Sequence, residues 1–307
     1  MKRRISRFFH FTLLIAILNV MPRPIWRLPA ALLATLRFMA DPVTRQVSGP
    51  ALKALSRPSN RFARWRFAWE ICYRHEASLI LAMQMARLTE SWLMRHVIIE
   101  GNLPPDGALL ITVHHNNSRL AALRLRAAGL PLALIAADGA AARSADDPEH
   151  EQRAEEYGVT QPLIAGVREA RRRSYAGNIF VPPRAARPGR RWLLDGGGLV
   201  IAADTFAGPW ARGVILKKAM PIPPGAVWLA QQTSKPIIPL VVRPRGKYWV
   251  LWLGEPLPTT TAGVAAGMES CIRQAQASWT SVCWHAWSEM PSWESNFVEE
   301  HDDMSGE

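Results

Sequence analysis

The sequence predicts an α/β protein with a mixed central sheet flanked by helices. From about residue 96 onward, short apolar segments alternate with segments of helical periodicity, a pattern typical of a sheet covered by helices. The first 95 residues have helical periodicity that prolines interrupt. We therefore expect a helical region at 1–95, an α/β domain at 96–291 and an acidic tail at 292–307.

The individual elements follow from the apolar runs and the residues that separate them. Helices are expected over most of residues 5–95, with breaks at Pro22, Pro24, Pro42, Pro50 and Pro58. Strands are expected at Val97–Glu100, Ala108–Val113, Leu132–Ala136, Ile179–Val181, Leu199–Ala203, Ile237–Val242 and Tyr248–Leu253. Further helices are expected at 118–128, 149–157, 162–173, 225–234 and 264–288, and a tight turn at Gly196–Gly198.

Composition excludes several classes of protein. A chain of 307 residues that is 49% hydrophobic can bury a sizeable core, and it is neither disordered nor fibrous. Its three cysteines, Cys72, Cys271 and Cys283, are scattered, which argues against a zinc site or a disulfide framework and for a reducing compartment. No run of 18 apolar residues is present, so a conventional membrane span is not expected.

The net charge of +12 is concentrated in the N-terminal quarter. Residues 1–75 contain 14 Lys/Arg and two acidic residues, whereas the basic and acidic groups of the remaining chain cancel. The same quarter is rich in apolar and aromatic residues, a combination that suits an anionic lipid surface. Nucleic acid is the competing partner for such a charge, but the apolar runs disfavour it, and we expect none.

The segment from Phe8 to Met21 has three interpretations. Basic residues precede its apolar stretch as in a signal peptide, but no small-residue cleavage site follows. Arg23 and Arg27 make the second flank basic too, which favours a shallow or re-entrant anchor. The third interpretation is an amphipathic helix buried in the domain. We expect a peripheral protein or a single N-terminal anchor.

The main candidates for catalytic residues lie in residues 108–117, ALLITVHHNN. His114 and His115 stand at the end of a predicted buried strand, and a predicted helix begins near Ser118. A histidine at the carboxyl end of such a strand is well placed to act as a general base. Arg119, five residues after His114, is a cation.

Three blocks of sequence resemble the lysophospholipid acyltransferase superfamily, and in particular the bacterial late acyltransferases of lipid A biosynthesis. The first is VIIEGNL (97–103) followed by the histidine segment. The second is LVIAADT (199–205) with Arg212 and Gly213 after it. The third runs from LKKAMPIPPG (216–225) to KPIIPL (235–240).

The resemblance implies an activity and roles for individual residues. It implies transfer of a fatty acyl group from a carrier-protein or coenzyme A thioester to a hydroxyl of a membrane lipid, glycolipid or specialised acyl product, without another cofactor or a metal. His114 matches the catalytic base, and Asn117, Arg119, Arg212 and Gly213 fall at substrate-binding positions. It also implies membrane lipids and acyl carrier protein as partners, at the cytoplasmic face of the bacterial inner membrane.

Arg119 departs from the pattern, because the resembling proteins have a carboxylate there that orients the histidine. An arginine donates hydrogen bonds and stays charged, so it cannot replace that carboxylate. Three alternatives remain. Asp204 or Asp138, both at predicted strand ends, supplies the carboxylate; His115 is the base; or Arg119 binds an anionic substrate while His114 acts alone.

Two functions from different classes are therefore compatible with the sequence. The first is an active acyltransferase with His114 as its base. The second is a non-catalytic homologue that binds lipid or acyl carrier protein as an accessory subunit. A second basic cluster could face an acidic carrier protein or a phosphorylated lipid; it contains Arg168, Arg171, Arg172, Arg173, Arg184, Arg187, Arg190 and Arg191.

Overall fold

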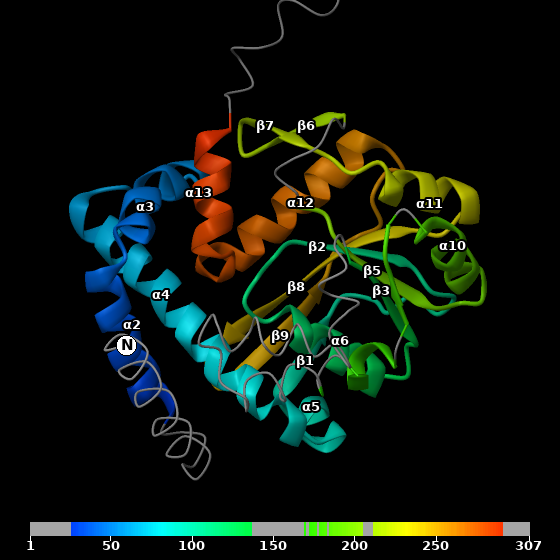
Figure 1. Cartoon of the computed structure of the whole chain (residues 1–307), viewed down its shortest axis with the longest axis horizontal. Coiled ribbons are helices and arrows are strands. Elements are labelled where there is room, and N and C mark those ends of the chain that lie inside the picture. The colour runs from blue at the N-terminus through cyan, green and yellow to red at the C-terminus, as the bar shows by residue number, and fades with distance from the viewer. Residues whose placement is uncertain are drawn as a thin grey trace, which may run out of the picture.

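A computed structural model describes residues 26–136, 169, 172–176, 178–182, 184–204 and 211–290. It confirms the predicted α/β class, with a mixed, mostly parallel sheet of seven strands between helices (Figure 1). The strands are β1 (Val97–Glu100), β2 (Leu109–Thr112), β3 (Leu132–Ile135), β4 (Ile179–Phe180), β5 (Gly198–Ala202), β6 (Arg212–Ile215), β7 (Lys218–Pro221), β8 (Ile237–Arg245) and β9 (Tyr248–Leu253). The helices are α2 (Arg27–Ala40), α3 (Pro42–Ala54), α4 (Arg61–Gln84), η2 (Met85–Arg87), α5 (Glu90–His96), α6 (Ser118–Ala127), α10 (Ala186–Leu194), α11 (Gly225–Thr233), α12 (Thr261–Ala275), η3 (Gln276–Ser278) and α13 (Ser281–Glu289).

The order of strands in the sheet places β2 at its centre. The order is β1-β9-β8-β2-β5-β3-β4, and β6 and β7 form a separate antiparallel pair. The strands from β8 to β4 in this order are parallel, whereas β9 runs antiparallel to β8, and β1 runs parallel to β9. The carboxyl ends of the five parallel strands therefore share one edge of the sheet, the edge at which open α/β sheets bind ligands.

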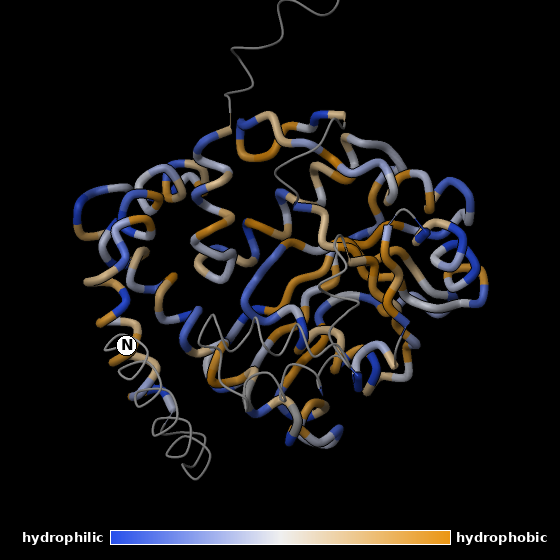
Figure 2. The backbone as a smooth tube through the Cα atoms, in the orientation of Figure 1, coloured by the Kyte–Doolittle hydropathy of each residue, from blue (hydrophilic) through white to orange (hydrophobic). Residues whose placement is uncertain are grey.

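Two apolar layers hold helices on the two faces of the sheet. On one face, α5 and α6 pack over alternate residues of the strands, such as Leu110 of β2 and Val242 of β8. On the other, α10, α11 and α12 cover residues such as Ile111 and Val241, and α3 and α13 contribute to the same apolar cluster. The strands are accordingly among the most hydrophobic parts of the tube in Figure 2. Burial on both faces explains why these strands are continuous apolar runs in the sequence.

The strand predictions were confirmed for the seven-stranded sheet, with small shifts at the ends. β1 and β9 have the predicted bounds, and β8 is three residues longer than predicted, ending at Arg245. The β6–β7 hairpin was not predicted, because Arg212–Pro221 contains no apolar run of strand length. Its turn uses Leu216 and Lys217, both with positive φ, where glycine or asparagine would have signalled a hairpin.

The helix predictions were confirmed for α6 and α11, and one was wrong. The helix predicted at 264–288 is divided into α12, η3 and α13, with Gln276 at a φ of 46° in the break. Thr280 starts α13 by accepting a hydrogen bond from the N–H of Cys283 (3.3 Å). Apolar periodicity continues across this break and concealed it. α10 was missed because Pro188 and Gly189 lie inside it. The helix predicted at 149–157 and most of the one at 162–173 lie outside the described residues.

The described N-terminal residues are helical, as predicted, with one break misplaced. Pro42 begins α3 after the cap residue Asp41, but Pro50 lies inside α3 instead of ending it. Packing of α3 against α4 and α13 maintains the helix there.

No helix in the described part of the chain is long and apolar enough to cross a membrane. The segment 8–21 and the tail 292–307 lie outside the described residues.

Trp284 of α13 anchors the C-terminal helices to the core and provides a test of this packing. Its fully buried ring meets Phe67, Trp279 and Trp287 edge-on, at centroid distances of 6.3, 4.6 and 5.6 Å. We expect Trp284→Ala to lower the free energy of unfolding in urea by about 3–5 kcal/mol, because it leaves a large cavity. Trp228→Ala, on the half-exposed face of α11, is the control and should cost far less. Equal losses of unfolding free energy in the two variants would contradict the role of Trp284 as the anchor of the C-terminal helices.

Candidate functional site

His114 stands at the carboxyl edge of the sheet, immediately after the central strand. β2 is buried along its whole length, and the chain leaves the sheet at Val113. The side chain of His114 is 62% exposed, whereas both of its neighbours in the chain are buried. The end of a rigid, fully buried strand thus presents one imidazole to solvent.

Asp204 follows β5, the parallel neighbour of β2, and lies against His114. The N–H of Ala203 extends the pairing by donating to the carbonyl of Thr112 (2.8 Å), which brings the next residue level with His114. Nδ1 of His114 donates to Oδ1 of Asp204 over 2.8 Å, and the backbone N–H of His114 donates to Oδ2 over 2.7 Å. The carboxylate thus holds both the ring and the backbone of His114.

A third donor completes the environment of this carboxylate. Nε1 of Trp279, which lies between η3 and α13, donates to Oδ2 of Asp204 over 2.9 Å. The segment around Trp279 is fixed against the histidine loop, because Asn116 N–H donates to the carbonyl of Ser278 over 3.0 Å. The Asp204 side chain has no exposed surface. Buried carboxylates require such donors, and three N–H groups supply them here.

These contacts define the tautomer and basicity of His114. Because Nδ1 donates to a carboxylate, the neutral ring carries its proton there, and Nε2 remains as the basic nitrogen. The hydrogen bond and charge of Asp204 raise the pKa of His114 above its ordinary value, and they outweigh burial, which acts in the opposite direction. His114 and Asp204 therefore have the geometry of a base and the carboxylate that orients it.

His115 is placed in a different environment. It is 4% exposed; Nδ1 donates to the carbonyl of Val113 (2.9 Å), and Nε2 accepts from the N–H of Val242 in β8 (3.1 Å). Burial lowers the pKa of His115 to about 4. Both nitrogens are occupied and the ring is neutral, so the geometry does not support the alternative in which His115 is the base. Its role here is to join the histidine loop to β8.

Asn117 and Arg119 lie at the start of α6. Asn117 is buried at the position before the helix, but its side chain makes no capping hydrogen bond, and its Oδ1 has no partner among the described residues. Arg119 is half-buried in the first turn of α6. Asp204 occupies the place beside His114 that a carboxylate at position 119 was expected to fill. Asp138 lies outside the described residues.

Arg212 and Gly213 begin β6, and their described contacts lie outside this cluster. They line a cavity of about 730 Å³ between β6 and α12, and neither His114 nor Asp204 is among its described lining residues. Gly213 packs so closely that a Cβ would come within 2.7 Å of Ala265 and 2.8 Å of Ile222. Close packing of the hairpin on α12 is therefore sufficient to explain this glycine.

The sequence did not identify Trp279 as a residue of the site. It falls within the stretch predicted as one continuous helix, and a tryptophan among other apolar residues is expected in the core. The signal that could have found it is the short segment Gln276–Thr280, in which a capping threonine precedes a second helix start.

The second basic cluster is partly described. Arg184, Arg187, Arg190 and Arg191 are exposed on and just before α10. Arg172 and Arg173 lie on a separate helical segment, and Arg172 pairs with Glu169 at 2.7 Å. Arg168 and Arg171 lie outside the described residues. Among the described residues, no group of three or more His, Cys, Asp or Glu side chains gathers to hold a metal ion.

Comparison with known proteins does not decide what this chain does. No family model matches the chain, and no curated protein matches it. Among solved structures, the chain is similar to the 1-acyl-sn-glycerophosphate (LPA) acyltransferase PlsC from Thermotoga maritima. The two are 14% identical, the match covers 80% of this chain and 93% of that chain, and the TM-score is 0.30. A similarity this low does not assign an activity, which has to be argued from the site itself.

The contrast between the two histidines can be measured by NMR titration. We expect His114 to titrate above the ordinary value of about 6.5. His115 should stay neutral down to about pH 4, because burial disfavours its charged form. In Asp204→Asn, the pKa of His114 should fall, since the hydrogen bond and charge that raise it are lost. An unchanged His114 titration in that variant would contradict the assigned pairing.

Proposed function

We propose that this protein is an acyltransferase in which His114 is the general base and Asp204 orients it. The observation that carries the proposal is the hydrogen bond between His114 Nδ1 and the buried Asp204 carboxylate, with Nε2 left as the basic nitrogen at an exposed ring. The sequence blocks that resemble acyltransferases surround this pair: one contains His114 and another contains Asp204.

In the proposed reaction, the acyl group moves from a thiol sulfur to a hydroxyl oxygen, and the proton of that hydroxyl moves to the thiol. Nε2 of His114 removes the proton from an acceptor hydroxyl as its oxygen attacks the carbonyl carbon of an acyl thioester. The carbon–oxygen ester bond forms, the carbon–sulfur bond breaks, and the imidazolium returns its proton to the leaving thiolate. Asp204 stabilises the imidazolium between these steps and keeps Nε2 directed at the substrate, as in other histidine–aspartate pairs.

The donor and acceptor follow from the sequence resemblance and from charge. We propose a carrier-protein or coenzyme A thioester as the donor and a membrane lipid or glycolipid as the acceptor. The exposed arginines of α10 suit an acidic carrier protein. α10 leads into the start of β5, and Asp204 follows the other end of the same strand.

The alternative function, a non-catalytic accessory subunit, was motivated by Arg119. A chain without a carboxylate beside its histidine would be a poor catalyst. Asp204, held by three donors, provides that carboxylate from another strand. The arrangement therefore favours an active enzyme, and measured activity distinguishes the two functions.

We further propose that the protein works at the cytoplasmic face of the bacterial inner membrane, docked through α2. The four apolar residues Leu28, Leu32, Leu36 and Met39 form a stripe on this helix and are 48–72% exposed. Phe62 and Trp65 are also exposed at the start of α4, and Arg61 lies 5.0 Å from the Trp65 ring. Residues 26–66 contain eight Lys/Arg and one acid. Apolar and basic groups together favour an anionic lipid surface.

Turnover with radiolabelled acyl thioesters and membrane lipids tests the proposed chemistry. His114→Ala should abolish product formation. Asp204→Asn should lower kcat by about 10⁴, by analogy with other histidine–aspartate pairs. Because the base must be neutral, the rate should rise with pH through the raised pKa of His114. Product formation that survives His114→Ala, or lipid and carrier binding without any turnover by the native protein, would contradict the proposal.

Co-sedimentation with vesicles tests the docking face. The double variant Leu32→Asp/Leu36→Asp should bind vesicles containing anionic lipid about tenfold or more weakly, because two leucines no longer enter the interface. Leu194→Asp, at a half-exposed leucine of α10, is the matched control and should bind as the native protein does. Equal binding by both variants would exclude α2 as the docking face.

A further inference from the structure

Trp279 is joined to the proposed base through the carboxylate that both side chains bind. Its ring is fully buried, and its Nε1–H donates to Oδ2 of Asp204 over 2.9 Å. Nδ1 of His114 donates to the other carboxylate oxygen, Oδ1, over 2.8 Å. A donor that binds one end of a buried carboxylate also acts on the group at the other end, because the protein interior screens charge weakly. Trp279 therefore acts on His114 through Asp204.

His114 itself supplies two of the three described donors to this carboxylate. Its backbone N–H donates to Oδ2 over 2.7 Å, and Nδ1 donates to Oδ1. These two bonds engage both oxygens from one residue, so they hold the carboxylate against His114 with or without a third donor. The Nε1–H of Trp279 shares Oδ2 with the backbone N–H. What the indole adds is the positive end of an N–H dipole, placed against the negative charge.

Backbone contacts hold the segment around Trp279 against the histidine loop independently of its side chain. The N–H of Asn116 donates to the carbonyl of Ser278 over 3.0 Å, and the N–H of Thr280 donates to the carbonyl of His114 over 3.4 Å. Trp279 lies between these two contacts, in antiparallel pairing with the loop. A substitution that removes only the indole N–H therefore leaves the backbone contacts that place the loop.

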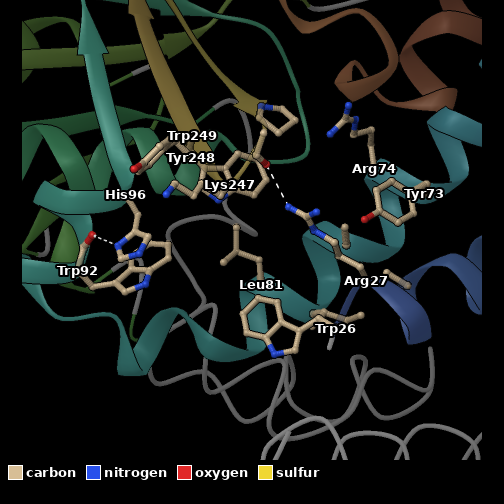
Figure 3. A pocket seen from close by; sticks show the side chains of 15 residues that line it. Trp26, Arg27, Tyr73, Arg74, Leu81, Trp92, His96, Lys247, Tyr248 and Trp249 are labelled. Carbon is tan, nitrogen blue, oxygen red and sulfur yellow. Dashed lines mark hydrogen bonds between the residues drawn. The ribbon is translucent and has the colours of Figure 1, made fainter. Parts of the chain in front are cut away.

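The Asp204 carboxylate is separated from the described cavities as well as from the surface. Its side chain has no exposed area. Figure 3 shows a cavity of about 720 Å³ between α2, α4, α5 and the turn between β8 and β9, and a second cavity lies between β6 and α12. Neither has Asp204, His114 or Trp279 among its described lining residues. Protein N–H groups therefore stabilise this charge in place of bulk water, and each has a larger effect than a donor at a surface.

We propose that Trp279 is a positioning residue that sets the basicity of His114 by placing its indole N–H against the Asp204 carboxylate. The dipole offsets part of the negative charge that attracts the protonated imidazole. The proton on His114 is therefore held less tightly than it would be by a carboxylate that lacked this third donor. In terms of the proposed function, on which the kinetic consequence rests, Trp279 extends the range of pH in which His114 is neutral and accepts the hydroxyl proton.

His114 is the group whose titration reports on this contact near neutral pH. The charge of Asp204 also acts on His115, Cys271 and Cys283. Burial lowers the pKa of His115 to about 4, raises the pKa of Cys283 to about 12 and also raises the pKa of Cys271. These three groups keep one protonation state while His114 titrates. A change in the titration of His114 therefore reports a change at the carboxylate.

NMR titration of Trp279→Phe tests the inference without requiring turnover. The variant keeps a buried aromatic ring and removes the N–H. We expect the pKa of His114 to rise by about half a unit or more, because Asp204 loses the dipole that offsets its charge. Trp287→Phe is the matched control, since it removes an N–H that a second buried tryptophan donates to the carbonyl of Ile215 over 3.2 Å. It should leave the titration of His114 unchanged.

The other outcomes of this titration would overturn the inference. A fall in the pKa of His114 in Trp279→Phe would mean that the indole holds the carboxylate in place instead of offsetting its charge. An unchanged pKa, or the same rise in Trp287→Phe, would mean that Trp279 has only a structural role.

A reciprocal measurement keeps Trp279 and changes its acceptor, so it applies even where Trp279→Phe does not fold. The indole N–H of Trp279 has its own signal in a proton–nitrogen correlation spectrum. In Asp204→Asn this signal should move upfield, because a neutral amide accepts a weaker hydrogen bond than a carboxylate. The indole signal of Trp287 should stay in place. A Trp279 signal that does not move would also overturn the inference.

Turnover separates this inference from the assignment of the base. In Trp279→Phe, the midpoint of the rise in kcat with pH should move upward together with the pKa of His114. If the native protein shows no turnover, or if that midpoint stays while the pKa of His114 moves, the proposed function is wrong and the effect of Trp279 on His114 stands.

Discussion

The buried carboxylate of Asp204 is the constraint on which the candidate site depends. A carboxylate without solvent contact carries a desolvation penalty of several kcal/mol, unless donors surround it. Two of its three donors belong to His114 and one to Trp279. One side chain thus fixes the end of β5, the loop after β2 and the segment that follows α12. Removing it would leave three buried or half-buried donors without their acceptor, in addition to freeing the imidazole.

This arrangement makes the orientation of His114, the proposed base, depend on the C-terminal helices. Trp279 reaches Asp204 because the chain breaks between α12 and α13. In a continuous helix, the side chain of Trp279 would not lie beside Asp204. Trp284 packs against Trp279, and Trp287 donates to the carbonyl of Ile215 in β6 (3.2 Å), so the break is supported from several sides. Stability of the tryptophan cluster and basicity of His114 are therefore coupled through one indole N–H.

The sequence predicted the sheet well because its strands are buried on both faces and appear as uninterrupted apolar runs. It also placed a histidine at the end of the central strand. It could not choose between Asp204 and Asp138, or between His114 and His115, because those choices depend on loop conformation and on contacts 90 residues apart. Trp279 was missed for a related reason, since helical periodicity does not reveal a break that tertiary contacts impose.

The contact between Asp204 and His114 changes the interpretation of Arg119. A carboxylate in the first turn of α6 would have been favoured by the positive end of the helix dipole as well as by the histidine. In this chain the negative charge is instead supplied from β5, at a position without solvent contact, where it accepts from the ring and the backbone of the same residue. The hydrogen bond to Asp204 raises the pKa of His114, although burial of the imidazole acts in the opposite direction. In the proposed acyltransferase, position 119 is therefore not needed to orient the base, and a cation there is compatible with an anionic substrate.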